Sequence, residues 1–203
     1  RRPDAAPDDP ARITVRFERG RPVAIDEKPV NLLEAFTLAN RIGGEHGVGI
    51  GTHLVENRFV GIKSRGVYEA PGMEVLGTAY GFLLQLILDR RAREFFDGLS
   101  SLMAKQIYQG YGYDLATRMV REALRPVTEL VTGNVTLSLY KGQASFHSAE
   151  HAPHSLYSEA NSSMEAIGEF DHADSEGFLR VLSVSARALA AAGQVVGLNR
   201  PVG

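Results

Sequence analysis

The chain has 203 residues, of which 44% are hydrophobic and 23% are charged, and its formal net charge at pH 7 is -2. This composition is typical of a soluble globular domain with one core. The small net charge gives no sign of binding to nucleic acid or a membrane surface, and no run of eighteen apolar residues predicts a membrane span. Cysteine is absent, which excludes disulfides and thiolate chemistry and agrees with a cytoplasmic protein.

The first ten residues, Arg1 to Pro10, contain three prolines and no initiator methionine or apolar signal-peptide core. Prolines among small and charged residues are typical of a linker, so we expect residues 1–12 to connect this chain to something longer. Alternating apolar and polar residues at 13–18, and an apolar run at 23–25, then predict two strands joined by a turn. Residues 26–29 are expected to form a loop.

A helix is predicted to begin after Asn31, because Glu34 lies three residues further on and completes a capping box. Gly43 and Gly44 are expected to end this helix. Its apolar face is expected to contain Leu32, Leu33, Phe36, Leu38 and Ala39.

The segment His46–Gly51 contains three glycines. It does not have the G-x-G-x-x-G spacing between a strand and a helix that binds dinucleotides, and no G-x-x-x-x-G-K-[ST] loop occurs in the sequence. We therefore interpret it as a flexible approach to the next strand, which is predicted at residues 54–62.

Three helices are predicted in the middle of the chain. The first begins at Pro71 and runs to Leu88; it is apolar on nearly all sides, which is typical of a buried helix. The second spans Asp89–Tyr108 and has an apolar stripe on one face. The third spans Asp114–Val131, where Pro126 is expected to bend or split it.

Residues 135–140 alternate as in a strand, and a tight turn at 142–143 returns the chain through a second strand at 144–147. Residues 151–168 are polar and irregular, and an amphipathic helix is predicted at 175–192. Four to five strands joined mostly as hairpins, with helices between and after them, predict an α+β fold with an antiparallel sheet. The pattern does not distinguish whether the last helix packs on its own domain or on another subunit.

Charged and polar residues gather between Val55 and Pro71, where they offer a floor for a small polar ligand. Alternation along a strand would place Glu56 and Arg58 on one face, and Glu69 is positioned to cap the helix at Pro71. The residues alone favour a simpler interpretation, in which Glu56 and Arg58 form a solvated ion pair and Tyr68 is a packing residue.

Three histidines, His147, His151 and His154, are spaced by four and three residues, with Glu150 among them. A helix would align them, but Pro153 argues against a helix there. Because zinc needs a fixed geometry, we predict no metal site.

Short motifs that run through nearly the whole chain resemble the C-terminal synthetase domain of argininosuccinate synthase, in the family's order. The central ones are Glu56-Asn57-Arg58, Lys63-Ser64-Arg65-Gly66 and Tyr68-Glu69-Ala70-Pro71. The flanking ones are Phe17–Gly20, Asn40–Gly44, His46–Gly49, Leu88–Arg90, Tyr108–Gly110, Leu139–Gly142 and Gly177-Phe178. The segment after His46 is one residue longer than the family form.

The resemblance implies an ATP-dependent carbon–nitrogen ligase of arginine biosynthesis and the urea cycle, which joins citrulline to aspartate with ATP and Mg²⁺ in the cytoplasm. The ureido oxygen of citrulline is adenylylated, and the aspartate amine then displaces AMP. The family's phosphate loop, of Ser-Gly-Gly-x-Asp type, belongs to a nucleotide-binding half and does not occur in this sequence. ATP and Mg²⁺ are therefore expected mainly on that half, and this chain alone is expected to be inactive.

The resemblance also assigns parts of the chain. Residues 1–12 are expected to be the linker from the nucleotide-binding half, 13–174 the synthetase domain, and 175–203 a helical arm and tail that joins the subunits of a homotetramer. Glu56 and Tyr68 match the family's citrulline-binding residues, and no catalytic nucleophile or metal ligand is implied. Possible substrate or interface residues without an individual role are Arg58, Lys63, Ser64 and Arg65.

Two alternatives stay open at this point. One is a free-standing, non-catalytic module of the same fold that assembles or regulates a partner. The other is a related ligase whose acceptor is not citrulline.

Overall fold

The computed structural model describes residues 1–157 and 172–194, without the side chains of residues 52–57 and 172. The chain divides into two units, residues 1–156 and 157–203, which we describe separately.

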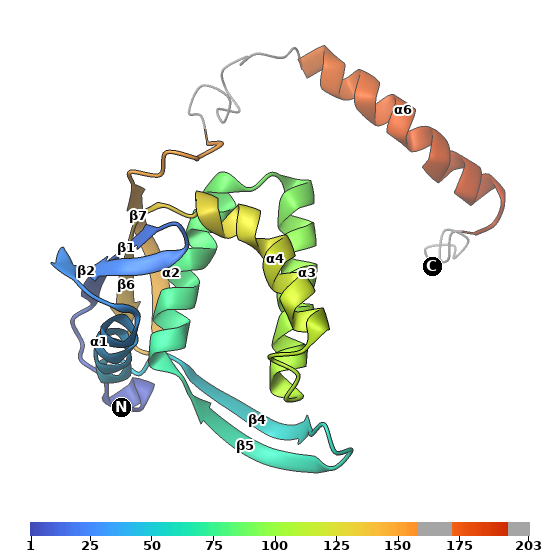
Figure 1. Ribbon diagram of the computed structural model, residues 1–203. Helices are drawn as coiled ribbons and strands as arrows, with labels where there is room; N and C mark the ends of the chain where they lie inside the picture. The colour runs from blue at the N-terminus through green and yellow to red at the C-terminus, as the bar shows by residue number, and fades with distance from the viewer. Residues whose placement is uncertain (158–171, 195–203) are drawn as a thin grey trace, which may run out of the picture. The chain divides into compact units, whose positions relative to one another are not determined.

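A five-stranded antiparallel sheet with the strand order β3-β2-β1-β6-β7 forms the centre of the first unit (Figure 1). Its strands are β1 (Ala11–Glu18), β2 (Arg21–Ile25), β3 (Lys28–Pro29), β6 (Gly133–Tyr140) and β7 (Gln143–Glu150). The predicted α+β class with an antiparallel sheet is confirmed. The loop predicted at residues 26–29 was partly wrong, because Lys28–Pro29 pairs with the edge of β2.

Two helices, α1 (Leu32–Glu45) and α2 (Pro71–Ile87), cover one face of this sheet (Figure 1). The apolar side chains of β1 and β6 face them and are buried, whereas Thr14 and Thr136 on the other face hydrogen-bond to each other at 2.8 Å. The core therefore lies between one sheet face and two helices. Its largest members are Ile13, Val15, Phe17, Leu83, Leu137 and Leu139.

The capping box predicted for α1 is confirmed: Asn31 Oδ1 accepts from Glu34 N at 3.0 Å, and Glu34 Oε2 accepts from Asn31 N at 2.8 Å. The predicted apolar face was wrong in part, since Leu32 and Leu33 are exposed. The buried residues of α1 are small: Ala35, Ala39 and Gly43. Small residues allow α1 to lie close to α2.

The prediction that two glycines end α1 was also wrong, because the helix continues through them to Glu45. A Cβ added at Gly43 would lie 3.0 Å from Val75 Cγ2 and 3.1 Å from Pro71 Cβ. Gly43 is thus a packing position inside the helix. The chain leaves the helix at Gly47, which has a φ of +72°.

A separate two-stranded ribbon, β4 (Ile50–Asn57) with β5 (Lys63–Glu69), extends from the unit below the sheet (Figure 1). The single strand predicted at 54–62 was wrong: the chain turns after β4 and returns as a strand. Arg58 lies in that turn, so its predicted place on a strand face was also wrong. Glu69 belongs to β5, and the start of α2 has no side-chain cap.

Two further helices, α3 (Arg90–Tyr108) and α4 (Leu115–Leu130), pack against each other. The predicted apolar stripe of α3 has no buried residue in the described chain. The helix α4 continues past Pro126 without a break, so the predicted split does not occur.

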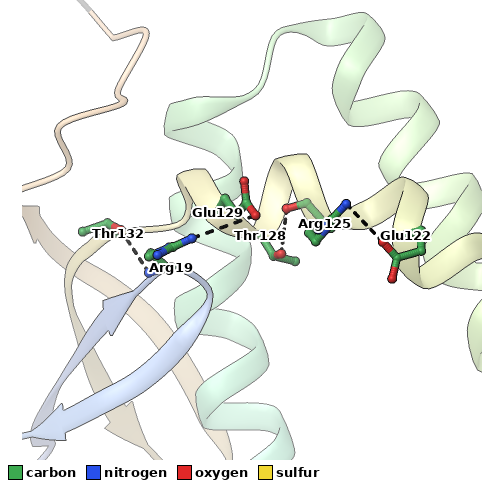
Figure 2. Close-up of polar contacts among 6 residues, drawn as sticks. All are labelled: Arg19, Glu122, Arg125, Thr128, Glu129 and Thr132. Atoms are coloured by element: carbon green, nitrogen blue, oxygen red, sulfur yellow. Dashed lines mark hydrogen bonds and ion pairs between the residues drawn. The ribbon is translucent and has the colours of Figure 1, made fainter. Parts of the chain in front are cut away.

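The carboxyl end of α4 is fastened to the turn between β1 and β2 (Figure 2). Arg19 N donates to Thr132 Oγ1 at 3.1 Å, and Arg19 Nη2 lies 4.0 Å from Glu129 Oε1. Within α4, Thr128 Oγ1 donates to the carbonyl of Arg125 at 2.9 Å. These contacts attach the helix pair to the sheet.

The second unit contains α6 (His172–Ala191). Six large apolar side chains of this helix are exposed: Phe178, Leu179, Val181, Leu182, Val184 and Leu189. Among the described helices of both units, none combines the length and hydropathy needed to cross a bilayer.

Candidate functional site

The register of the β4–β5 ribbon determines which residues share a face. His53 lies opposite Gly66, and Glu56 lies opposite Ser64, so β4 advances three residues where β5 advances two. The extra residue forms a β-bulge. Because Ser64, Gly66 and Tyr68 alternate onto one face, the bulge places position 56 on the same face as Tyr68.

Tyr68 borders a hollow of about 520 Å³ at the base of the ribbon. Its ring lies over Gly66, where an added Cβ would come within 3.1 Å of Tyr68 Cε2. The tyrosine is 47% exposed. Residues in or next to β4, α2 and the β6–β7 turn complete the lining: Gly49, Ile50, Gly51, Ala70, Met73, Glu74 and Gly142.

Glu56 lies nearer than the hollow to the turn that joins β4 and β5. Its partner Ser64 is four residues from Tyr68, a separation of roughly 13 Å along a strand. The side chain of Glu56 lies outside the described structure. Its backbone position is compatible with a ligand that extends along the ribbon from the hollow.

The other residues proposed from the motif are divided between the two faces. Ser64 is half-buried and alternates onto the face of Tyr68. Lys63 and Arg65 are exposed and lie on the opposite face. The structure therefore brings only Ser64, of these three, onto the face that borders the hollow.

The glycines between His46 and Gly51 serve chain packing. A Cβ at Gly47 would lie 2.8 Å from Pro3 Cα, and one at Gly49 would lie 2.6 Å from Pro71 Cα. Backbone atoms of neighbouring segments thus leave no room for a side chain at either position. The segment leads, as predicted, into the next strand, β4, which begins at Ile50, and its close packing against Pro3 and Pro71 explains two of its glycines.

His46 contributes its backbone to this region. Its carbonyl accepts a hydrogen bond from Gly142 N at 2.8 Å. The side chain is only 7% exposed, and its Nδ1 atom has no hydrogen-bond partner among the described residues. Over the described part of the chain, no three His, Asp or Glu side chains form a group that would hold a metal ion.

Two lining residues, Glu74 and Gly142, were not anticipated from the sequence. Glu74 lies in the first turn of α2, and the proline at the start of that helix was a local signal for its position. Gly142 reaches the hollow only because the β6–β7 turn contacts the end of α1. No local pattern reveals such a contact.

A five-stranded antiparallel sheet with two helices on one face, together with a separate β-ribbon, defines an α+β domain. Residues 1–189 match the family model described as the argininosuccinate synthase C-terminal domain, and the chain belongs to this family.

Curated relatives agree with this assignment. The chain is 42% identical over 189 residues to the argininosuccinate synthase of Rhodopirellula baltica, which covers 91% of this chain and 45% of that protein. It is 40% identical over 191 residues to the argininosuccinate synthase of Jannaschia sp., covering 94% of this chain and 46% of that protein. The chain thus spans slightly less than half the length of these ligases.

Proposed function

We propose that this chain is the citrulline-binding and assembly half of an argininosuccinate synthase, and that citrulline binds in the hollow beside Tyr68. The observation that carries the proposal is the position of Tyr68, a residue of the family motif, at the edge of this hollow. The membership of the chain in the family supports it.

Citrulline has a charged amino-acid end and a neutral ureido end, and it needs different partners at the two ends. A phenol such as Tyr68 both donates and accepts hydrogen bonds, which suits a neutral polar end. A carboxylate such as Glu56 accepts a charge-assisted hydrogen bond from an α-ammonium group. Placed on one face of the ribbon, the two residues would hold an extended citrulline between them.

The hollow is open on one side, and we assign the residues that close this side to the other half of the enzyme. That half would also hold ATP and Mg²⁺, since the family's Ser-Gly-Gly-x-Asp phosphate loop does not occur in this sequence. ATP supplies activation of the ureido oxygen when it is bound. The residues of this chain bind citrulline and orient it for that chemistry.

A comparison of this chain with the complete enzyme tests the proposal. We expect the 203-residue chain to form no argininosuccinate from ATP, citrulline and aspartate, while the complete protein forms it. Mass spectrometry of the product provides the measurement. Turnover by the chain alone, or none by the complete protein, would contradict the division into two halves.

The exposed apolar side chains of α6 support the role of this helix as an arm between subunits. Removal of residues 175–203 from the complete protein should therefore shift the assembly from a homotetramer to smaller species. Multi-angle light scattering measures this directly. An unchanged mass would refute the role as an arm.

A further inference from the structure

The turn between β6 and β7 holds the segment that precedes β1. Lys141 and Gly142 form this turn, with φ angles of +45° and +88°. Lys141 Nζ donates to the carbonyl oxygen of Ala6 at 2.7 Å and lies 2.8 Å from Asp8 Oδ1. One side chain thus binds both a backbone carbonyl and a carboxylate of residues 3–8.

The same segment is held at a second point, around Pro3. A Cβ at Gly142 would lie 3.0 Å from Pro3 Cγ, and one at Gly47 would lie 2.8 Å from Pro3 Cα. Ala6, whose carbonyl accepts from Lys141, is 5% exposed. Residues 3–8 are therefore packed against the domain, unlike a free linker.

This attachment and the candidate site share a residue. Gly142 lines the hollow beside Tyr68 and at the same time contacts Pro3. Its N–H donates to His46 O at 2.8 Å, which fixes the turn against the end of α1. The path of residues 3–8 is thus determined by the turn that forms one wall of the hollow.

We propose that Lys141 is a positioning residue, which fastens residues 3–8 beside the Tyr68 hollow so that the preceding half of the protein meets its open side in one place. The positioning part of this inference rests on the proposed function. A fixed connection raises the effective concentration of the preceding half of the protein near the hollow. It also reduces the number of orientations in which that half cannot complete the site.

The electrostatics of the contact agree with this role. The hydrogen bond and charge of Lys141 hold the pKa of Asp8 below its usual value, and Asp8 in turn raises the pKa of Lys141. Both groups are therefore charged near neutral pH. The carbonyl of Ala6 adds a partner that does not titrate, so Lys141 carries more of the attachment than Asp8 does.

The test uses the complete protein with Lys141→Met, which keeps the length of the side chain but removes its charge and donors. Lys141→Arg retains both and serves as the rescue. The matched control is Lys28→Met in β3, at the opposite edge of the sheet. Hydrogen exchange of the amides in residues 4–9 reports the attachment, and the citrulline KM and kcat report the positioning.

We expect exchange in residues 4–9 to become roughly tenfold faster in Lys141→Met, because the segment opens more often. The citrulline KM should also rise roughly tenfold, because the two halves of the protein close the hollow less often. The melting temperature should not change. Lys141→Arg should restore both values, and Lys28→Met should alter neither.

Unchanged exchange in Lys141→Met would overturn the proposal, whether or not the protein makes argininosuccinate. Faster exchange with an unchanged KM in an active protein would overturn the positioning role. A complete protein that makes no argininosuccinate but shows faster exchange would reject the proposed function and uphold the attachment.

Discussion

Replacing Gly49 by alanine should leave little folded domain. Gly49 has a φ of +78°, and its added Cβ would lie 2.6 Å from Pro71 Cα and 2.8 Å from the carbonyl carbon of Ala70. These are backbone atoms at the start of α2, a helix whose inner face forms the core, so they cannot move aside cheaply. The clash and the strained φ together should lower the free energy of unfolding by at least about 3 kcal/mol.

Urea unfolding followed by circular dichroism measures this loss, and the chain offers a matched control. Gly81 lies inside α2, and a Cβ there would meet nothing within 4 Å. Because alanine favours helices more than glycine does, Gly81→Ala should stabilise the domain by about 0.5–1 kcal/mol. Equal stability of Gly49→Ala and the original chain would show that the close approach of Gly49 to Pro71 is wrong.

In the complete enzyme, Glu56→Gln should raise the citrulline KM by roughly 10- to 100-fold, because a hydrogen bond to a charged group contributes about 1.5–3 kcal/mol. The ATP KM should change little. Tyr68→Phe removes a neutral hydrogen bond of about 0.5–1.5 kcal/mol and should raise the citrulline KM by roughly 3- to 10-fold. Steady-state kinetics with each substrate varied in turn provide the measurement.

The matched control for the tyrosine is Tyr113→Phe, since Tyr113 is 96% exposed and lies between α3 and α4, away from the lining of the hollow. It should leave both KM values unchanged. If Glu56→Gln raised the KM values for citrulline and ATP equally, Glu56 would not belong to the citrulline site. An unchanged citrulline KM in Tyr68→Phe would mean that the phenol does not contact this substrate.

Local sequence patterns were sufficient to predict a strand that faces the core and a helix that begins at a capping residue. The alternation at residues 13–18 predicted β1, and Asn31 with Glu34 predicted the start of α1. The strand β5 was missed because it pairs only with β4, outside the main sheet, and therefore shows no apolar alternation. Leu33 is exposed because the close contact between α1 and α2 uses small residues instead.

The candidate site was predictable in part, through its motif. Tyr68 was proposed from the sequence and lines the hollow. Glu74 and Gly142 were not proposed, because they reach the hollow through the packing of α2 and of the β6–β7 turn. Tertiary contacts between distant segments leave no periodic signal in the chain. The role of Glu56 stays a prediction.

The bulge in β4 has a consequence for how this protein family can change over evolutionary time. A residue inserted into a regular strand turns every following side chain to the other face. Here the register shift between His53 and Glu56 absorbs one residue before the motif begins, and Glu56 still lies opposite Ser64. One extra residue upstream of Glu56 is therefore tolerated without a change in the backbone pairing between Glu56 and Ser64.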